Sequence, residues 1–171
     1  MADPELLAAA QALLDLCRSR KLRIAAAESC TGGLLTATLT EIPGSSDVLD
    51  RGFVTYSNAA KSAMLRVSAS TLDDHGAVSR ETAEAMAQGA LAESGVDLSV
   101  SITGIAGPGG ATAGKPAGLV HLAAATRDGR LLHRQRNFGD IGRAQVRRAS
   151  VLEALGMLME LARGRKLVSS E

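Results

Sequence analysis

The sequence predicts an α/β fold, a three-layer α/β/α sandwich around a mixed, mostly parallel sheet of about five strands. Two observations predict it. Short apolar runs alternate with segments of helical periodicity along most of the chain, and strands separated by helices pair in parallel. Late in the chain, two strand-like runs are joined directly around Asp128-Gly129, a dipeptide typical of an antiparallel hairpin. We therefore expect one antiparallel strand in an otherwise parallel sheet.

The length and composition favour one domain without large side chains in its core. A chain of 171 residues fits a single domain over 1–171, with its core at about 5–162 and a flexible tail at 163–171. Apolar residues make up 46% of the chain and aromatic residues only 2%, so small aliphatic side chains must form the core. The net charge of +1 and the scarcity of aromatic residues argue against nucleic-acid binding.

Several classes of protein and of site are disfavoured. The first residues are acidic where a signal peptide is basic, and no apolar run reaches the roughly 18 residues of a membrane span, so we expect a cytoplasmic protein without a membrane partner. Cys17 and Cys30 lack C-x-x-C spacing. His75, His121 and His133 show no metal-ligand spacing, so we expect neither a metal nor a cofactor.

The first helix, strand and second helix follow from capping and periodicity. Asp3 caps a helix that begins at Pro4 and ends in the basic residues 18–21. A strand over 23–28 then turns at paired glycines into a helix that runs to about Glu41. The apolar residues that share one face of the first helix are Leu6, Ala10, Leu13, Leu14 and Cys17.

The middle of the chain repeats this alternation. A second strand is expected over 48–56, followed by short helical pieces that end before a break at 73–76. Ser79 caps a helix over 80–94, and a third strand over 96–103 leads into a second glycine-rich loop at 104–110.

The end of the chain supplies the hairpin and a closing helix. The hairpin strands are expected at 118–126 and 130–138, and the helix at about 142–162. The apolar stripe predicted for this helix is Ala149, Leu152, Leu155, Met159 and Ala162. Val151 and Met157 lie off that stripe, which indicates either broad burial or a subunit contact, and we expect a homo-oligomer.

The segment Ala27-Glu28-Ser29-Cys30-Thr31-Gly32-Gly33 is the first candidate for a functional site. It joins the first strand to the second helix, where unpaired amides favour an anion and glycines allow close approach to the backbone. The alternative is structural, because Ser29 or Thr31 fits the N-cap position of that helix equally well.

The ends of three predicted strands gather further reactive groups. Ligands bind outside the carboxyl ends of parallel strands, and these ends carry Ser29, Tyr56 with Lys61 just after it, and Thr103. A lysine whose pKa is lowered can take the proton of a serine nucleophile. In this hypothesis Tyr56 relays between the pair, Thr103 orients the amine, and amides near residues 30–33 or 104–107 stabilise an oxyanion.

Each of these interpretations has an alternative. Lys61 alone reads as a solvated surface residue, Tyr56 as a residue at the edge of the core, and Cys30 as a second choice of nucleophile. Arg143, at the start of the last helix, suits a substrate phosphate. Residues 109–115 fit part of a phosphate-loop motif, but Pro116 replaces its hydroxyl residue and a strand follows, so we reject the match.

Four ordered motifs resemble the CinA C-terminal domain family, the nicotinamide-nucleotide amidases. The resemblance covers about residues 5–162 and is closest to the stand-alone form of the family. Its motifs are Ala27 to Gly33, Gly52-Phe53-Val54-Thr55-Tyr56-Ser57-Asn58 with Lys61, His75-Gly76-Ala77-Val78-Ser79, and Thr103-Gly104-Ile105-Ala106-Gly107-Pro108. Thr103 stands where some relatives have Ser, and the spacing from Gly109 to Arg143 varies.

The resemblance implies an enzyme that deamidates nicotinamide mononucleotide to nicotinate mononucleotide and ammonia, in pyridine nucleotide recycling. It implies a serine nucleophile and a lysine base, at Ser29 and Lys61. The residues expected beside them in catalysis or substrate binding are Tyr56, Thr103, Cys30, Thr31, Gly32, Gly33, Gly104, Gly107 and Arg143. Two alternatives stay open: a non-catalytic domain that binds a nucleotide or a partner, linked to competence or DNA damage, and hydrolysis of a different amide.

Overall fold

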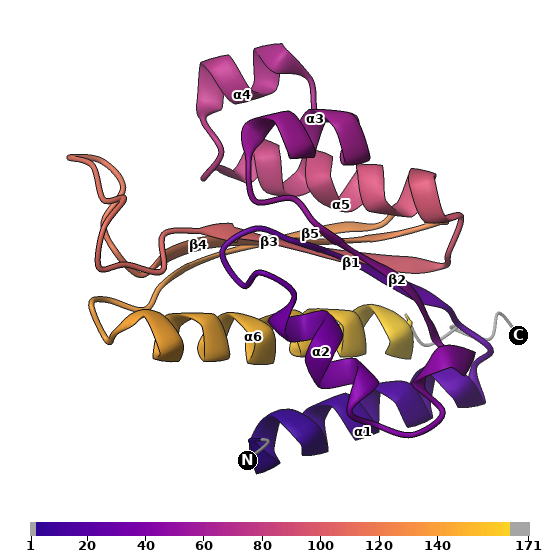
Figure 1. Cartoon of the computed structure of the whole chain (residues 1–171). Coiled ribbons are helices and arrows are strands. Elements are labelled where there is room, and N and C mark those ends of the chain that lie inside the picture. The colour runs from indigo at the N-terminus through magenta and orange to yellow at the C-terminus, as the bar shows by residue number, and fades with distance from the viewer. Residues whose placement is uncertain (1–2, 165–171) are drawn as a thin grey trace, which may run out of the picture.

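The computed structural model describes residues 3–164, which form one five-stranded sheet and six α-helices (Figure 1). The strands are β1 (Ile24–Glu28), β2 (Leu49–Val54), β3 (Leu98–Gly104), β4 (Leu119–Thr126) and β5 (Leu131–Asn137). The helices are α1 (Pro4–Ser19), α2 (Leu34–Thr40), α3 (Asn58–Leu65), α4 (Ala69–His75), α5 (Arg80–Ser94) and α6 (Arg143–Arg163). A short 3₁₀ turn, Ser45–Asp47, precedes β2.

Helices cover both faces of the sheet, which confirms the predicted α/β class and its layers. Helices α1, α2 and α6 lie on one face, and α3, α4 and α5 lie on the other (Figure 1). The strand order is β2-β1-β3-β4-β5. β1 pairs in parallel with β2 and with β3, whereas β4 runs antiparallel to both of its neighbours. The carboxyl ends of β1, β2 and β3 therefore meet at one edge.

The small side chains allow close packing on the α5 face. Ala83 and Ala87 of α5 are buried with Ala123 and Ala125 of β4. At Gly89 an added Cβ would lie 2.0 Å from the carbonyl oxygen of Leu65, so this glycine is what lets α3 approach α5. Because α3 carries Lys61, this contact helps to place the lysine over the edge of the sheet.

Helix α4 differs from the local prediction. Helix α4 continues through Asp73, Asp74 and His75 and stops only at Gly76, because Ser68 caps its start and Leu72 anchors it in the core. The expected break is therefore a helix end.

Helix α6 is buried more widely than its predicted stripe. It lies between α1 and strands β3 and β4, so two faces are covered. Val151 and Met157 are fully buried within the chain, which selects broad burial over a subunit contact at these two positions. Ala149, Leu152 and Met159 of the predicted stripe are only half-buried. Of the predicted tail, Arg163 belongs to this helix and Gly164 caps it, while 165–171 lies outside the described residues.

Candidate active site

Ser29 and Lys61 are in direct contact beyond the carboxyl end of β1. Ser29 follows the last residue of that strand, and Lys61 lies in the first turn of α3, which Ser57 caps. The Lys61 Nζ atom lies 3.0 Å from the Ser29 Oγ atom and 2.8 Å from the Thr55 carbonyl oxygen. Lys61 is only 1% exposed, so the alternative of a solvated surface lysine is wrong.

The surroundings of Lys61 favour its neutral form. Burial lowers the pKa of this amine below its ordinary value of 10.5. Within residues 3–164, no carboxylate forms an ion pair with it. A neutral amine has one lone pair and two hydrogens. It can accept the hydroxyl proton of Ser29 while it donates a hydrogen bond to the Thr55 carbonyl.

The first turn of α2 is held by Glu28 and not by a serine or threonine cap. The buried Glu28 carboxylate accepts hydrogen bonds from the amides of Gly33, Leu35 and Thr36 and from the Thr36 hydroxyl, at 2.8–3.1 Å. The N-cap position is occupied by Gly33, with a φ of +97°. The interpretation of Ser29 or Thr31 as the N-cap is therefore wrong.

Glu28 also changes the expected anion site. It accepts a hydrogen bond from the Gly33 amide, one of the amides near residues 30–33 that were expected to stabilise an oxyanion, and the Gly32 amide donates to the Ser29 carbonyl. Among the described residues, the amides of Cys30 and Thr31 donate no hydrogen bond to another group. Of these two residues, Cys30 lines the cleft that contains Ser29 and Thr31 does not.

Tyr56 does not bridge the serine and the lysine. The residue is 62% exposed, and its phenol oxygen accepts a hydrogen bond of 2.8 Å from Arg143 Nη2. Arg143 Nη1 donates to the Gly107 carbonyl at 3.0 Å. The expected relay is wrong because Lys61 reaches Ser29 directly, and Tyr56 instead joins Arg143 to the segment after β2. It is also not an edge residue of the core.

Thr103 does not orient the lysine amine. It is fully buried, and its hydroxyl donates a hydrogen bond of 2.6 Å to the Ala77 carbonyl. Ala77 belongs to the segment between α4 and α5 that lines the cleft beside Ser29. Thr103 therefore fixes one wall of the cleft and makes no hydrogen bond to Lys61.

The cleft beside Ser29 has a volume of about 250 Å³. The predicted site residues that line it are Ser29, Cys30, Tyr56, Lys61, Thr103, Gly104, Gly107 and Arg143. The structure does not bring the other three to its walls. Thr31 is fully buried, and its hydroxyl has no hydrogen-bond partner among the residues that the structure describes. Gly32 and Gly33 shape the turn in left-handed conformations.

Cys30 is a poor nucleophile in this setting. Burial raises the pKa of its thiol to about 11, so the reactive thiolate is scarce at neutral pH. Cys17 is likewise buried in the core, as predicted.

Two residues near the site carry roles that the sequence analysis missed. Glu28 ends an otherwise apolar strand, and a charged residue at the end of a buried run was the available signal. Arg147 Nη2 donates a hydrogen bond of 2.8 Å to the Thr31 carbonyl. The sequence feature that could have pointed to Arg147 is its spacing of four residues from Arg143, which puts both side chains on one face of α6.

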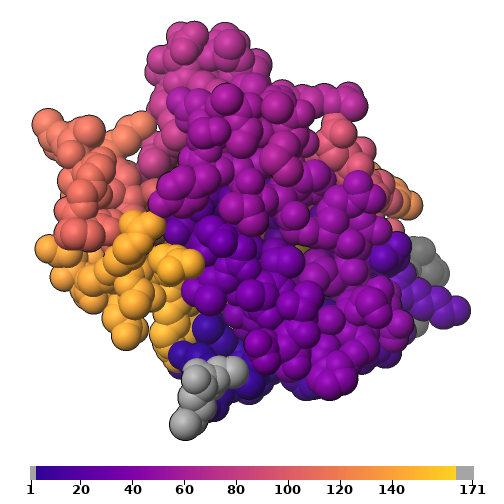
Figure 2. Space-filling view, in the orientation of Figure 1, coloured from indigo at the N-terminus to yellow at the C-terminus, as the bar shows by residue number. Residues whose placement is uncertain are grey.

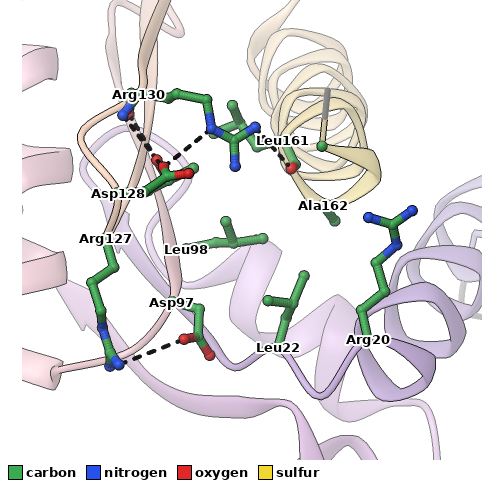
Figure 3. Close-up of a pocket in the computed structure, with 11 residues that line it drawn as sticks. Arg20, Leu22, Asp97, Leu98, Arg127, Asp128, Arg130, Leu161 and Ala162 are labelled. Atoms are coloured by element: carbon green, nitrogen blue, oxygen red, sulfur yellow. Dashed lines mark hydrogen bonds and ion pairs between the residues drawn. The ribbon is translucent and has the colours of Figure 1, made fainter. Parts of the chain in front are cut away.

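A larger cleft lies away from Ser29, around the start of β3 and the turn between β4 and β5 (Figure 3). It has a volume of about 450 Å³. Two of its three arginines are paired, Arg127 with Asp97 and Arg130 with Asp128, whereas Arg20 forms no ion pair within residues 3–164. Arg130 also contacts the Leu161 carbonyl.

The described residues include neither a membrane-spanning helix nor a metal-binding cluster of side chains. No helix within residues 3–164 combines the length and the apolar character needed to cross a membrane. In the same range, no three His, Cys, Asp or Glu side chains are grouped so that they could hold a metal ion.

Residues 7–162 match the family described as the CinA C-terminal domain. The chain is 47% identical to the nicotinamide-nucleotide amidohydrolase PncC of Enterobacter agglomerans, over 80% of this chain and 84% of that protein. It is 57% identical to a CinA-like protein of Chloroherpeton thalassium over 66% of this chain, but only 27% of that protein. The chain thus spans 27% to 29% of the length of the first curated relatives it matches.

Solved structures agree with this relationship. The fold matches the crystal structure of the competence/damage inducible protein CihA from Agrobacterium tumefaciens with a TM-score of 0.92 and 50% identity, over 94% of this chain and 98% of that one. A CinA superfamily protein from Escherichia coli matches with a TM-score of 0.87 and 34% identity, over 94% and 93% of the two chains. The chain belongs to the CinA C-terminal domain family.

Proposed function

We propose that this protein is an amidohydrolase that converts nicotinamide mononucleotide into nicotinate mononucleotide and ammonia, in pyridine nucleotide recycling. The observation that carries the proposal is the buried contact of 3.0 Å between Lys61 Nζ and Ser29 Oγ at the wall of a cleft. A relative of nearly the same extent is named a nicotinamide-nucleotide amidohydrolase, which supports the choice of substrate.

The first half of the reaction acylates Ser29. The neutral Lys61 amine takes the hydroxyl proton as Ser29 Oγ attacks the carbon of the substrate carboxamide. The tetrahedral intermediate then expels its nitrogen, to which Lys61 returns the proton, and ammonia leaves. The Thr55 carbonyl keeps the amine on the serine through its 2.8 Å hydrogen bond.

The second half releases the acid. Water gives a proton to Lys61 and attacks the acyl carbon, and the Ser29 oxygen leaves and recovers that proton. In both halves negative charge develops on the carbonyl oxygen, and the unpaired amide of Cys30, which lines the cleft, is the donor proposed to stabilise it. No step requires the thiol of Cys30.

The other end of the cleft suits a phosphate. Arg143 lines it and carries a guanidinium that two neutral oxygen atoms, from Tyr56 and Gly107, hold in place. Neither partner neutralises its charge, so an anionic group of the substrate can pair with it.

The experiment is ammonia release from nicotinamide mononucleotide by the wild type, Ser29→Ala and Ser99→Ala. Ser99 is the matched control, because it is a buried serine on a neighbouring strand that does not line the cleft, with its hydroxyl bonded to the Ala87 carbonyl. Activity is expected to disappear in Ser29→Ala and to persist in Ser99→Ala. A folded Ser29→Ala protein with wild-type turnover overturns the mechanism, and nucleotide binding by the wild type without turnover overturns the enzyme assignment.

A further inference from the structure

Arg147 connects the last helix of the chain to the turn that carries Ser29. Its Nη2 atom donates to the Thr31 carbonyl at 2.8 Å, although the two residues lie 116 positions apart in the sequence. The same carbonyl also accepts the Leu34 amide at 3.0 Å. Arg147 is half-buried and does not line the cleft, so it acts from behind the turn.

The hydrogen bond reaches Ser29 through a single peptide unit. The Thr31 carbonyl and the Gly32 amide belong to one rigid plane. That Gly32 amide donates to the Ser29 carbonyl at 3.0 Å. The side chain of Arg147 therefore fixes the plane from one side while the plane holds the backbone of Ser29 from the other.

The bonding of Arg147 differs from that of its neighbour Arg148. Arg148 pairs with the carboxylates of Asp3 and Glu5, as an arginine that joins two helices does. Within residues 3–164, Arg147 forms no ion pair, and its Nε atom is buried without a partner. An unpaired buried N–H group destabilises a fold, so the stability of the fold does not account for this side chain.

Arg143 and Arg147 together tie down the ends of all three parallel strands. Arg143 bonds to Tyr56 after β2 and to Gly107 after β3, and Arg147 bonds to Thr31 after β1. The loop after β3 and the start of α6 lie on the same side of the molecule and adjoin on its surface (Figures 1 and 2).

We propose that Arg147 is a positioning residue for the nucleophile. It holds the Thr31-Gly32 peptide so that Ser29 stays in contact with Lys61 and the free Cys30 amide stays beside the reacting carbonyl, and its unneutralised charge favours the developing oxyanion. This inference rests on the proposed amidohydrolase function for its substrate, but not for its geometry.

The first measurement is steady-state ammonia release by Arg147→Met, Arg147→Lys and the matched control Arg148→Met. For Arg147→Met, kcat is expected to fall about 10- to 100-fold with KM within about twofold, because the substrate does not touch this side chain. Arg147→Lys is expected to recover part of kcat, and Arg148→Met to keep it even if its melting temperature falls. Wild-type kcat in Arg147→Met overturns the inference and leaves the proposed function standing.

The second measurement needs no nucleotide. The rate at which a fluorophosphonate labels Ser29, followed by mass spectrometry, reports the nucleophile and its oxyanion donors directly. Labelling is expected to be at least about tenfold slower in Arg147→Met than in Arg148→Met. If labelling slows in this way but the wild type does not hydrolyse nicotinamide mononucleotide, the role of Arg147 stands and the proposed substrate is wrong. Equal rates in folded variants, or no labelling of the wild type, overturn the inference. If Arg147→Met does not fold, the Arg147→Lys comparison decides.

Discussion

The cleft beside Ser29 and the larger cleft near the turn between β4 and β5 differ in how their polar groups are satisfied. The cleft beside Ser29 is the smaller, at about 250 Å³, but among residues 3–164 its buried lysine has no carboxylate partner and its arginine bonds only to neutral oxygen atoms. The larger cleft, at about 450 Å³, has two of its three arginines paired, with Asp97 and Asp128, and no lysine lines it (Figure 3). Unneutralised groups are what a substrate can use, so cleft size alone does not identify the site.

The difference follows from the topology. The smaller cleft lies where three parallel strands end, and loops leaving those ends are free to present side chains to one point. The larger cleft adjoins the turn between β4 and β5, where charged side chains close to one another in the sequence pair locally.

Replacement of Lys61 by Met is expected to cause the largest loss. Without the base, kcat for ammonia release should fall about 10²- to 10⁴-fold. Lys115→Met is the control, because Lys115 also donates to a backbone carbonyl, that of His75, but lies outside the cleft lining. If Lys61→Met keeps wild-type kcat, Lys61 is not the base, and its unneutralised amine does not mark the cleft beside Ser29 as the active site.

Replacement of Glu28 by Gln is expected to lower the free energy of unfolding by about 2–3 kcal/mol. The carboxylate now accepts hydrogen bonds from backbone N–H groups through both of its oxygens. The NH2 group of Gln would instead point its own hydrogens at some of these N–H donors. Urea denaturation measures the change. The control is Glu84→Gln, which removes a half-exposed ion pair with Arg80. It should lower the free energy of unfolding by only about 0.5 kcal/mol. Equal losses would mean that Glu28 does not organise the Ser29 turn.

Replacement of Arg143 by Ala is expected to raise KM for nicotinamide mononucleotide about tenfold with a smaller change in kcat, because the side chain is proposed to bind the phosphate. The comparison with nicotinamide riboside, which lacks the phosphate, sharpens the result. If kcat/KM of the variant falls by the same factor with both substrates, Arg143 does not contact the phosphate.

In the larger cleft, Arg127→Ala is expected to change neither kcat nor KM by more than about twofold. The pair with Asp97 is exposed, and such pairs contribute roughly 0–1 kcal/mol to stability. Ammonia release and a melting curve measure the two effects. A loss of activity comparable to that of Arg143→Ala would place a function in this cleft and contradict the comparison.

The sequence predicts which segments reach the site better than it predicts their contacts. Ser29 and Lys61 meet because both follow strands whose ends share one edge, and alternation along the chain is enough to infer that. The partners of Tyr56 and Thr103 were predicted wrongly, since the direction of a side chain beyond a strand end depends on loops from elsewhere. Helix α6 shows the same limit, because coverage by α1 as well as the sheet broadens its buried face.

Lys61 should also make stability depend on pH. Its pKa is lowered in the folded state, so between that pKa and 10.5 the unfolded chain binds a proton that the folded chain does not. The free energy of unfolding of the wild type relative to Lys61→Met should therefore rise as the pH rises through this window. A difference that is flat with pH would mean that burial leaves the amine unchanged.

The most direct test of the central claim is the pKa of the Lys61 amine, measured by ¹⁵N NMR of Nζ and compared with the acidic limb of kcat/KM for ammonia release. The account predicts one pKa, below 10.5, in both measurements, with activity lost as the pH falls and the amine becomes charged. A Lys61 amine that titrates at its ordinary pKa, while Ser29-dependent activity persists several pH units below it, would contradict the account.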